Sequence, residues 1–204
     1  MTNQPKPTHP TPPPAPTAAL APVQALIIID MQTAFVAGDG AVPDADRLLG
    51  RVRDLLARAR ESGAVVVQLQ NDGEPGTSDE PGTPGWEIHL PADTGRGEAV
   101  LRKTVDDGFE DSPLESLLRD AGVRELAVCG VMSEMCVRAT ASTALELGFR
   151  VVLPHDAHAT YDIPAAEGIG DVVPAATVSR VAEWTLGDEV EIVPRAADVV
   201  FTKP

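Results

Sequence analysis

The stretch Ala25-Leu26-Ile27-Ile28-Ile29-Asp30 decides the fold class of this 204-residue chain. Its five apolar residues include three β-branched isoleucines and end directly at an acidic residue. An uninterrupted apolar run of this length is typical of a strand that is buried on both faces. Such strands occur in parallel sheets covered by helices, so the stretch predicts an α/β protein.

Similar apolar runs recur along the chain and predict the remaining strands. They lie at residues 64–69, 100–103, 126–129, 151–153 and 190–193. Amphipathic segments separate several of these runs. This alternation predicts an open, mostly parallel sheet with helices on both faces.

Capping residues predict three of the helices, which begin at an N-cap and end before a glycine. The predicted start and stop pairs are Asp44 and Gly63, Ser112 and Gly122, and Ser133 and Gly148.

The composition excludes several classes of partner. The chain has 31 acidic and 16 basic residues, which give a net charge of −15. Phosphate backbones and anionic membranes repel such a chain, so we expect neither nucleic acid nor membrane as a partner. No apolar run reaches the roughly 18–20 residues of a membrane-spanning helix. Two cysteines are too few for a disulfide framework, and this favours the cytoplasm.

Residues 1–22 differ in composition from the rest of the chain. They hold eight of the nineteen prolines, and their one charged side chain is Lys6. A segment of this kind buries too little apolar surface to offset its chain entropy. We therefore expect a disordered tail over residues 1–22 and one folded domain over residues 23–204.

Three chemically active residues fall at predicted strand ends, where open α/β sheets bind their ligands. Asp30 ends the first strand, Lys103 ends another, and Cys136 follows a third. With Ser133 as its N-cap, a helix would hold Cys136 in its first turn, where the helix dipole lowers a thiol pKa. Asp30 could then accept the thiol proton and Lys103 could stabilise negative charge.

Each of these residues also has a purely structural interpretation. A cysteine is often core filler, an aspartate after a strand often fixes a turn, and a lysine is usually solvated. Lys103 stands out because it is the only lysine between Lys6 and Lys203, in a chain with thirteen arginines.

Several familiar site motifs are absent from the sequence. It has no dinucleotide-binding glycine motif, no phosphate-binding loop and no Gly-x-Ser-x-Gly nucleophile elbow. Cys129 and Cys136 are too far apart for a Cys-x-x-Cys pair. His155 and His158 are close in sequence but lack a clear set of further ligands, so we expect no metal and no cofactor.

Four segments together resemble a known family. Residues 25–35 (ALIIIDMQTAF) and 130–140 (GVMSEMCVRAT) are similar to the opening and nucleophile motifs of the isochorismatase-like cysteine hydrolases. Lys103, with the segment 109–114 after it, resembles the lysine region of that family, and residues 148–157 continue the match. The resemblance covers about residues 23–200.

This resemblance implies a three-layer sandwich around a parallel sheet. It implies Cys136 as the nucleophile, Asp30 as its base and Lys103 as electrostatic support. It further implies a cis peptide bond between Val131 and Met132, and an oxyanion hole formed by the backbone N–H groups of Met132 and Cys136. Members of the family commonly form homo-oligomers.

The reaction implied is hydrolysis of a small amide or lactam through a thioester on Cys136. Family members that cleave isochorismate lack this thiol, so its presence favours a carbon–nitrogen bond. Nicotinamidases of the family bind a metal through an Asp-x-His pattern, whereas residues 70–74 here read QNDGE. A nicotinamidase- or ureide-type reaction remains the alternative.

Acidic residues predict the kind of substrate. They reflect either ordinary solubility or a site that attracts cations, and opening of streptothricin-type lactams is a family activity that suits cations. The acidic residues expected at the rim are Asp72, Glu74, Asp106, Asp107, Glu110 and Glu134. The expected substrate contacts are Phe35, Trp86, Glu134 and His158, although Trp86 suits the core equally well.

Two functions outside amide hydrolysis are also compatible with the sequence. One is a non-catalytic binding protein on the same scaffold, which the intact Asp30, Lys103 and Cys136 disfavour. The other is a thiol redox protein that pairs Cys136 with Cys129, which the predicted strand position of Cys129 disfavours.

Overall fold

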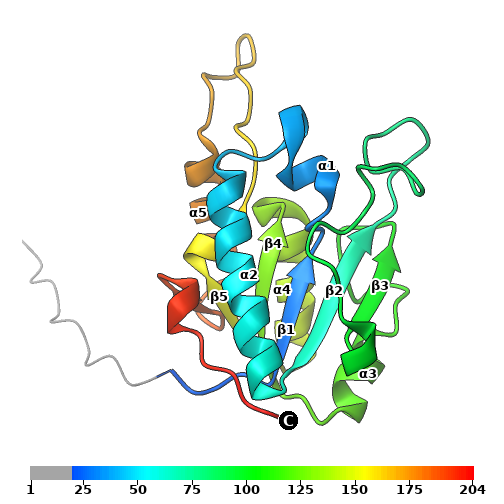
Figure 1. The fold of residues 1–204 in the computed structure, drawn as a ribbon. Coiled ribbons are helices and arrows are strands. Elements are labelled where there is room, and N and C mark those ends of the chain that lie inside the picture. The colour runs from blue at the N-terminus through cyan, green and yellow to red at the C-terminus, as the bar shows by residue number, and fades with distance from the viewer. Residues whose placement is uncertain (1–19) are drawn as a thin grey trace, which may run out of the picture.

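Parallel strands form one central sheet in the order β3-β2-β1-β4-β5-β7, and the short β6 pairs with the end of β4. This arrangement is seen in a computed structural model, which describes residues 20–204 (Figure 1). The strands are β1 (Ala25–Ile29), β2 (Val65–Asn71), β3 (Ala99–Lys103), β4 (Glu125–Val131), β5 (Arg150–Pro154), β6 (His158–Ala159) and β7 (Glu191–Val193).

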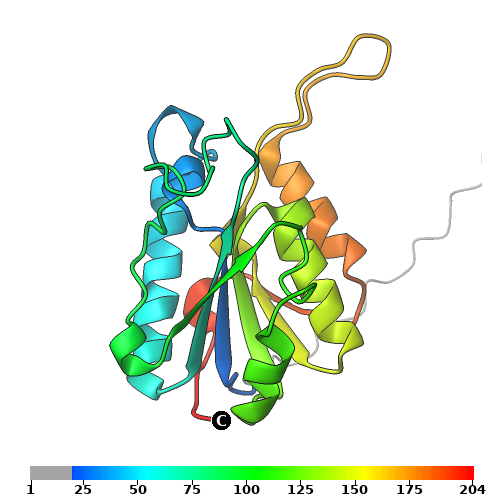
Figure 2. The same cartoon turned by 90° about the vertical axis from the view of Figure 1, so that its right-hand side faces the viewer.

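Helices cover both faces of the sheet, as predicted. Figure 2 shows α2 on one side of the sheet and α4 and α5 on the other, so the fold is a three-layer sandwich. The α-helices are α1 (Thr33–Val36), α2 (Ala45–Ser62), α3 (Leu114–Asp120), α4 (Arg138–Glu146) and α5 (Ala175–Thr185).

Strand β1 lies at the centre of the sheet and contributes to two cores. Leu26 and Ile28 belong to the core beneath α2, whereas Ala25, Ile27 and Ile29 belong to the core beneath α3 and α4. All five residues are fully buried. The apolar run therefore forms the doubly buried strand that the sequence predicts.

The helix boundaries confirm the predicted stops better than the predicted starts. Gly63 adopts the left-handed conformation directly after α2. Asp44 precedes α2 but makes no side-chain capping bond, and its own backbone is left-handed with φ 56°. Ser112 does accept a hydrogen bond from the N–H of Leu114 at the start of α3. Helix α5 was not predicted at all.

Residues 161–174 form an arm that projects beyond the carboxyl ends of the strands (Figures 1 and 2). Two antiparallel bridges, Ile163 with Val173 and Ala166 with Gly170, hold its two sides together. Ile169 at its tip is 88% exposed. The arm therefore presents apolar side chains to the surroundings.

The predicted tail lies almost wholly outside the described residues. At its inner end, the carbonyls of Ala21 and Pro22 accept hydrogen bonds from Arg150. Among residues 20–204, no helix combines the length and apolar character needed to cross a membrane.

Gly130, near the end of β4, permits the close approach of β4 to β1. Its φ is 121°, and a Cβ atom there would collide with the carbonyl oxygen of Ile29. We predict that Gly130→Ala lowers the free energy of unfolding by about 3 kcal/mol or more, from backbone strain and overpacking. Urea unfolding followed by circular dichroism measures this.

Gly50→Ala is the matched control, because Gly50 lies within α2 and a methyl group on its Cα would meet only open space. Alanine there should stabilise the protein by roughly 0.5–1 kcal/mol through helix propensity. Equal effects of the two substitutions would contradict the packing argument at Gly130.

Candidate active site

The carboxyl edge of the sheet brings Asp30, Lys103 and Cys136 together. Lys103 Nζ lies 2.7 Å from Asp30 Oδ2 and 3.2 Å from Cys136 Sγ. The side chains of Lys103 and Asp30 are 1% and 3% exposed. Three residues that are far apart in the sequence thus form one buried, charged cluster.

Strand order determines how these side chains meet. Asp30 directly follows β1, whereas Lys103 ends β3, and β2 lies between these two strands. Lys103 stands in register with Asn71 at the end of β2. Its long side chain therefore crosses the end of β2 to reach Asp30, which itself has a left-handed backbone with φ 49°.

The turn that carries Cys136 differs from the prediction. Residues 133–137 form a π-helical turn in which Met135 has non-helical angles (φ −108°, ψ −105°), and regular helix begins only at Arg138. Ser133 is not a helix cap, because its Oγ hydrogen-bonds His158 Nδ1 instead. The peptide bond between Val131 and Met132 is cis, as the family resemblance implied.

The expected lowering of the thiol pKa is wrong. Burial raises the pKa of the Cys136 thiol, and the Asp30 carboxylate raises it further. Burial also raises the pKa of Asp30, although Lys103 offsets part of that rise. For Lys103, burial alone would lower the pKa, but the negative charge of Asp30 raises it, and Cys136 raises it further in its thiolate form. The cluster thus combines a neutral thiol, a carboxylate of increased basicity and a firmly charged lysine.

A cavity of about 280 Å³ opens onto the sulfur of Cys136. Phe35 and Glu134, two of the four predicted substrate contacts, line it, and so does Met132, which was predicted for the oxyanion hole. The full lining is Asp30, Phe35, Asn71, Asp106, Val131, Met132, Glu134, Met135, Cys136 and Tyr161. Apolar walls with a few carboxylates suit a small organic molecule that carries polar groups.

Trp86 and His158, the other two predicted contacts, do not line this cavity. Trp86 Nε1 donates a hydrogen bond to Asp72 Oδ1 at 2.9 Å, and the guanidinium of Arg102 lies over the indole ring. The tryptophan is thereby held in the loop after β2, away from the cavity lining.

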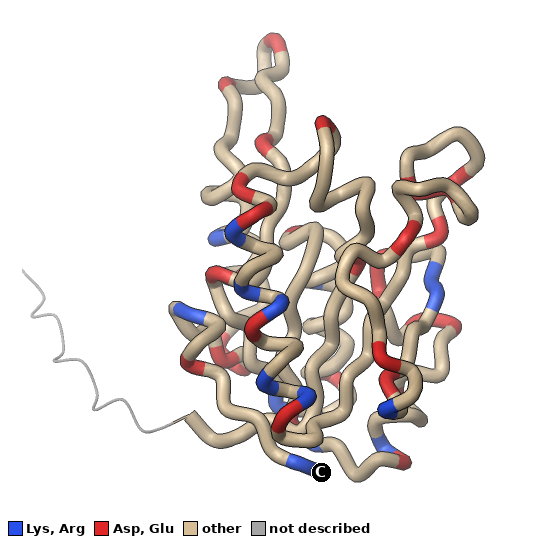
Figure 3. The backbone as a smooth tube through the Cα atoms, viewed as in Figure 1, with Lys and Arg blue, Asp and Glu red and all other residues tan. Residues whose placement is uncertain are grey.

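The acidic residues named from sequence separate into two groups. Asp106 and Glu134 line the cavity. By contrast, Asp72 pairs with Arg102, and Asp107 accepts a hydrogen bond from Thr143. Figure 3 shows further acidic residues in the loops beyond the carboxyl ends of the strands, where few basic residues lie.

Sequence reasoning did not identify Asn71, Met135 and Tyr161 as cavity residues. Asn71 ends β2, so its position at a strand end was an available signal. Tyr161 lies at the base of the arm, and no local pattern places it near Cys136.

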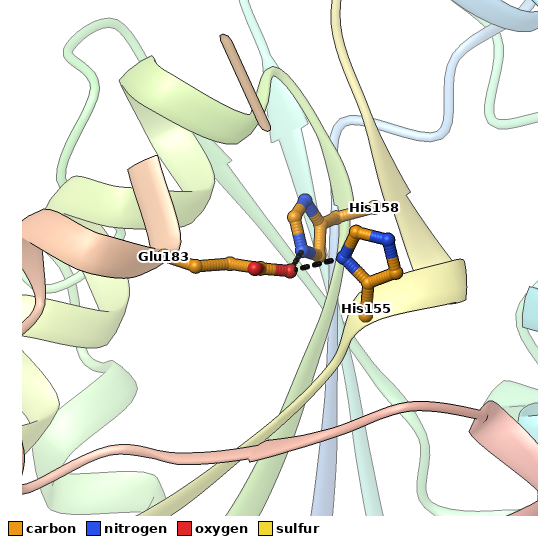
Figure 4. Close-up of side chains that lie close together, drawn as sticks. All are labelled: His155, His158 and Glu183. Carbon is orange, nitrogen blue, oxygen red and sulfur yellow. Dashed lines mark hydrogen bonds and ion pairs between the residues drawn. The ribbon is translucent and has the colours of Figure 1, made fainter. Parts of the chain in front are cut away.

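His155, His158 and Glu183 form a second polar cluster (Figure 4). Glu183 Oε1 lies 2.6 Å from His155 Nδ1 and 3.0 Å from His158 Nε2. Arg180 pairs with the other oxygen of Glu183. Glu183 is therefore the partner of both histidines, and the sequence alone did not indicate it.

The three residues of this cluster each offer an atom that could bind a metal ion, and these atoms lie within 4.8 Å of one another. Metal–ligand bonds of about 2.0–2.2 Å in tetrahedral geometry separate ligand atoms by roughly 3.3 Å. The 2.6 Å separation of His155 Nδ1 from Glu183 Oε1 is instead that of a charge-assisted hydrogen bond. The observed arrangement therefore fits a hydrogen-bond network around the Glu183 carboxylate, which extends through His158 to Ser133 and the turn carrying Cys136.

Comparisons with known proteins agree with this fold. A family model described as the isochorismatase domain matches residues 24–177. The chain is 71% identical to a streptothricin hydrolase of Streptomyces noursei, over 92% of this chain and 75% of that protein. It is 30% identical to a ureidoacrylate amidohydrolase of Variovorax paradoxus, over 71% of each chain.

A solved isochorismatase from Pseudomonas putida has the same fold, with a TM-score of 0.78 and 29% identity, covering 89% of this chain and 94% of that one. With this fold and these relatives, the protein is a hydrolase that acts on carbon–nitrogen bonds other than peptide bonds. The chain belongs to the isochorismatase family.

Glu183 provides a test of the second cluster. Although burial alone would raise its pKa, hydrogen bonds from His158, Arg180 and His155 lower it from 4.5 to about 2. A lowered pKa stabilises the fold above pH 4.5, and this stabilisation is lost as the pH falls toward 2. We predict that Glu183→Gln lowers Tm at pH 7 by on the order of 10 °C, with a smaller difference at pH 3.

Thermal unfolding monitored by circular dichroism between pH 7 and pH 3 measures both effects. Glu189→Gln is the control, because Glu189 is exposed. That variant should unfold within about 1 °C of the parent. A Tm difference for Glu183→Gln that is constant over this pH range would contradict the assigned ionisation.

Proposed function

We propose that this chain hydrolyses the lactam of streptothricin-type antibiotics, with Cys136 as nucleophile. The observation that carries the proposal is the contact of one buried lysine with both Asp30 and Cys136, at 2.7 Å and 3.2 Å, beside a cavity of substrate size. The 71% identity to a streptothricin hydrolase supports the choice of substrate.

Asp30 acts as the base in the first step. Its raised pKa makes it a better proton acceptor than an ordinary aspartate, and Lys103 stabilises the thiolate that remains. The thiolate then attacks the lactam carbonyl carbon. Because the thiol is neutral at rest, activation coincides with substrate binding.

The backbone N–H groups of Met132 and Cys136 hold the oxyanion of the tetrahedral intermediate. Asp30 returns its proton to the leaving nitrogen as the carbon–nitrogen bond breaks, which gives a thioester on Cys136 and a free amine on the opened ring. Water then attacks the thioester, and the products are a carboxylate and the regenerated thiol. The net change is addition of one water across the lactam bond.

Two observations count against the alternative functions. Cys129 and Cys136 belong to the cores on opposite faces of the sheet, so a disulfide between them would require local unfolding. Burying the ion pair of Lys103 and Asp30 beside a thiol costs several kcal/mol of desolvation. A protein that only binds its ligand has no use for such a pair, whereas a cysteine hydrolase does. The ureidoacrylate relative, at 30% identity, is the weaker guide to substrate.

We further propose that the protein works in the cytoplasm as a homo-oligomer. Both cysteines are free, which is typical of proteins in a reducing compartment. Exposed apolar side chains support self-association, since Ile169 on the arm is 88% exposed and Trp184 on α5 is 78% exposed.

Cys136→Ala should abolish lactam opening, reducing kcat by at least about 10³-fold, while leaving the fold intact. Turnover is measured by liquid chromatography with mass detection of the opened product. The parent protein mixed with substrate and quenched should carry an acyl adduct on Cys136 in intact-mass spectra. More than a few per cent of residual activity in the variant rules out the nucleophile assignment.

Cys129→Ala is the matched control for loss of a thiol. Cys129 lies within β4, outside the cavity lining, so this variant should keep its turnover and lose only some stability. Equal loss of turnover in both variants would mean that the thiol at position 136 has no special role.

The oligomer is tested by light scattering after size-exclusion chromatography. We expect a mass of two or more chains for the parent and a smaller mass for Ile169→Asp, which places a charge on the apolar tip of the arm. A parent that elutes with the mass of one chain would rule out the homo-oligomer.

A further inference from the structure

Asp106 is a carboxylate in contact with the candidate nucleophile, and sequence reasoning placed it only among six rim residues. The Cys136 thiol donates to Asp106 Oδ1 over 3.6 Å. Asp30 is buried and Asp106 is exposed, and both line the cavity. One buried and one exposed carboxylate thus lie close to the sulfur.

The negative charge of Asp106 has no counterion among the described residues. Within residues 20–204, the Lys103 ammonium forms its ion pair with Asp30, and Asp106 takes part in none. The negative charge of Asp106 also contributes to raising the pKa of Asp30. A like charge so close to the sulfur disfavours thiolate formation, and a second cation in the cavity would offset it.

Glu134 contributes a second unmatched carboxylate to the same cavity. Its Oε1 accepts a hydrogen bond from Thr160 Oγ1 at 2.9 Å. Its Oε2 is buried and has no hydrogen-bond partner within the described part of the chain. Asp30 is 2% exposed, and its Oδ1 lacks a partner there as well. A buried carboxylate oxygen that accepts no hydrogen bond destabilises the folded protein. A ligand with hydrogen-bond donors would supply the bonds that these oxygens lack.

The other walls of the cavity suit the body of a cation. Phe35, Met135 and Tyr161 add two aromatic rings and a thioether to the lining that holds the carboxylates. Aromatic faces attract ammonium and guanidinium groups, and a planar guanidinium has five donors with which to bridge carboxylates.

We propose that Asp106 and Glu134 form a cation subsite, which selects substrates with an ammonium or guanidinium group close to the amide that Cys136 attacks. This inference rests on the proposed role of Cys136 as nucleophile. The bound cation offsets the negative charge beside the sulfur, so it favours thiolate formation as well as binding. A neutral amide of equal size lacks both advantages.

Thiol labelling tests the subsite without relying on any substrate. The probes are an aminoethyl methanethiosulfonate, which is cationic, and its neutral methyl counterpart. Each is attacked by the thiolate to give a mixed disulfide and methanesulfinate. We expect the parent to prefer the cationic probe at Cys136 by about tenfold, after correction for the reactivity of each probe with a small free thiol.

Asp106→Asn should reduce this preference to near one, and Glu134→Gln should reduce it in part. Glu110→Gln is the matched control, because Glu110 is exposed near Asp106 but does not line the cavity. That variant should keep the parent preference. Intact-mass spectra with peptide mapping assign the label to Cys136 rather than Cys129.

Three results would overturn the subsite. The first is a parent that shows no preference for the cationic probe. The second is an equal loss of that preference in Asp106→Asn and Glu110→Gln. The third is a Cys136 sulfur that neither probe labels. The second of these would mean that the overall acidity of the protein attracts cations.

Turnover separates this proposal from the proposed function. With a streptothricin lactam as substrate, Asp106→Asn should lower kcat/KM by about tenfold or more, whereas Glu110→Gln should not. A parent that opens no lactam would refute the proposed substrate, and the labelling preference would still decide the cation subsite. A parent that opens the lactam but keeps its kcat/KM in Asp106→Asn would refute the subsite alone.

Discussion

The ion pair between Lys103 and Asp30 is the constraint on which the site depends. Burying two charges is costly, and the cost is offset only when the partners meet in good geometry. At 2.7 Å and nearly zero exposure, this pair meets that condition. The geometry requires β1, β2 and β3 to keep their register, because the lysine must cross the end of β2. Any slip of these strands would leave an unpaired buried charge, so the apolar sheet and the polar cluster support each other.

Much of the fold could be predicted from the sequence because the signals are local. The apolar run over Ala25–Ile29 requires burial on both faces, and Gly63 provides a left-handed helix end. The start at Ser133 was mispredicted for an equally physical reason. A serine before an apolar segment normally caps a helix, but here its hydroxyl bonds His158, which is distant in sequence. Long-range partners override local preferences, and one sequence does not reveal them.

The same distinction applies to the site. Asp30, Lys103 and Cys136 lie at strand ends, so topology alone brings them to one edge of the sheet. Trp86 and Tyr161 lie in long connections whose path no periodicity fixes. Trp86, expected as a substrate contact, is not part of the cavity lining, whereas Tyr161 is. Glu183 emerged only as the partner of His155 and His158. Topology therefore places Asp30, Lys103 and Cys136 together, but it does not determine the positions of Trp86 and Tyr161.

The placement of the two cysteines in separate cores affects how this protein responds to oxidants. The cavity opens onto Cys136, whereas Cys129 is fully buried on the other side of the sheet. If peroxide converts Cys136 to a sulfenic acid, no second thiol of the chain can reach it to form a rescuing disulfide. Recovery then depends on small thiols entering through the substrate cavity. The shape and charge of that opening would therefore govern repair of the nucleophile as well as access of the substrate.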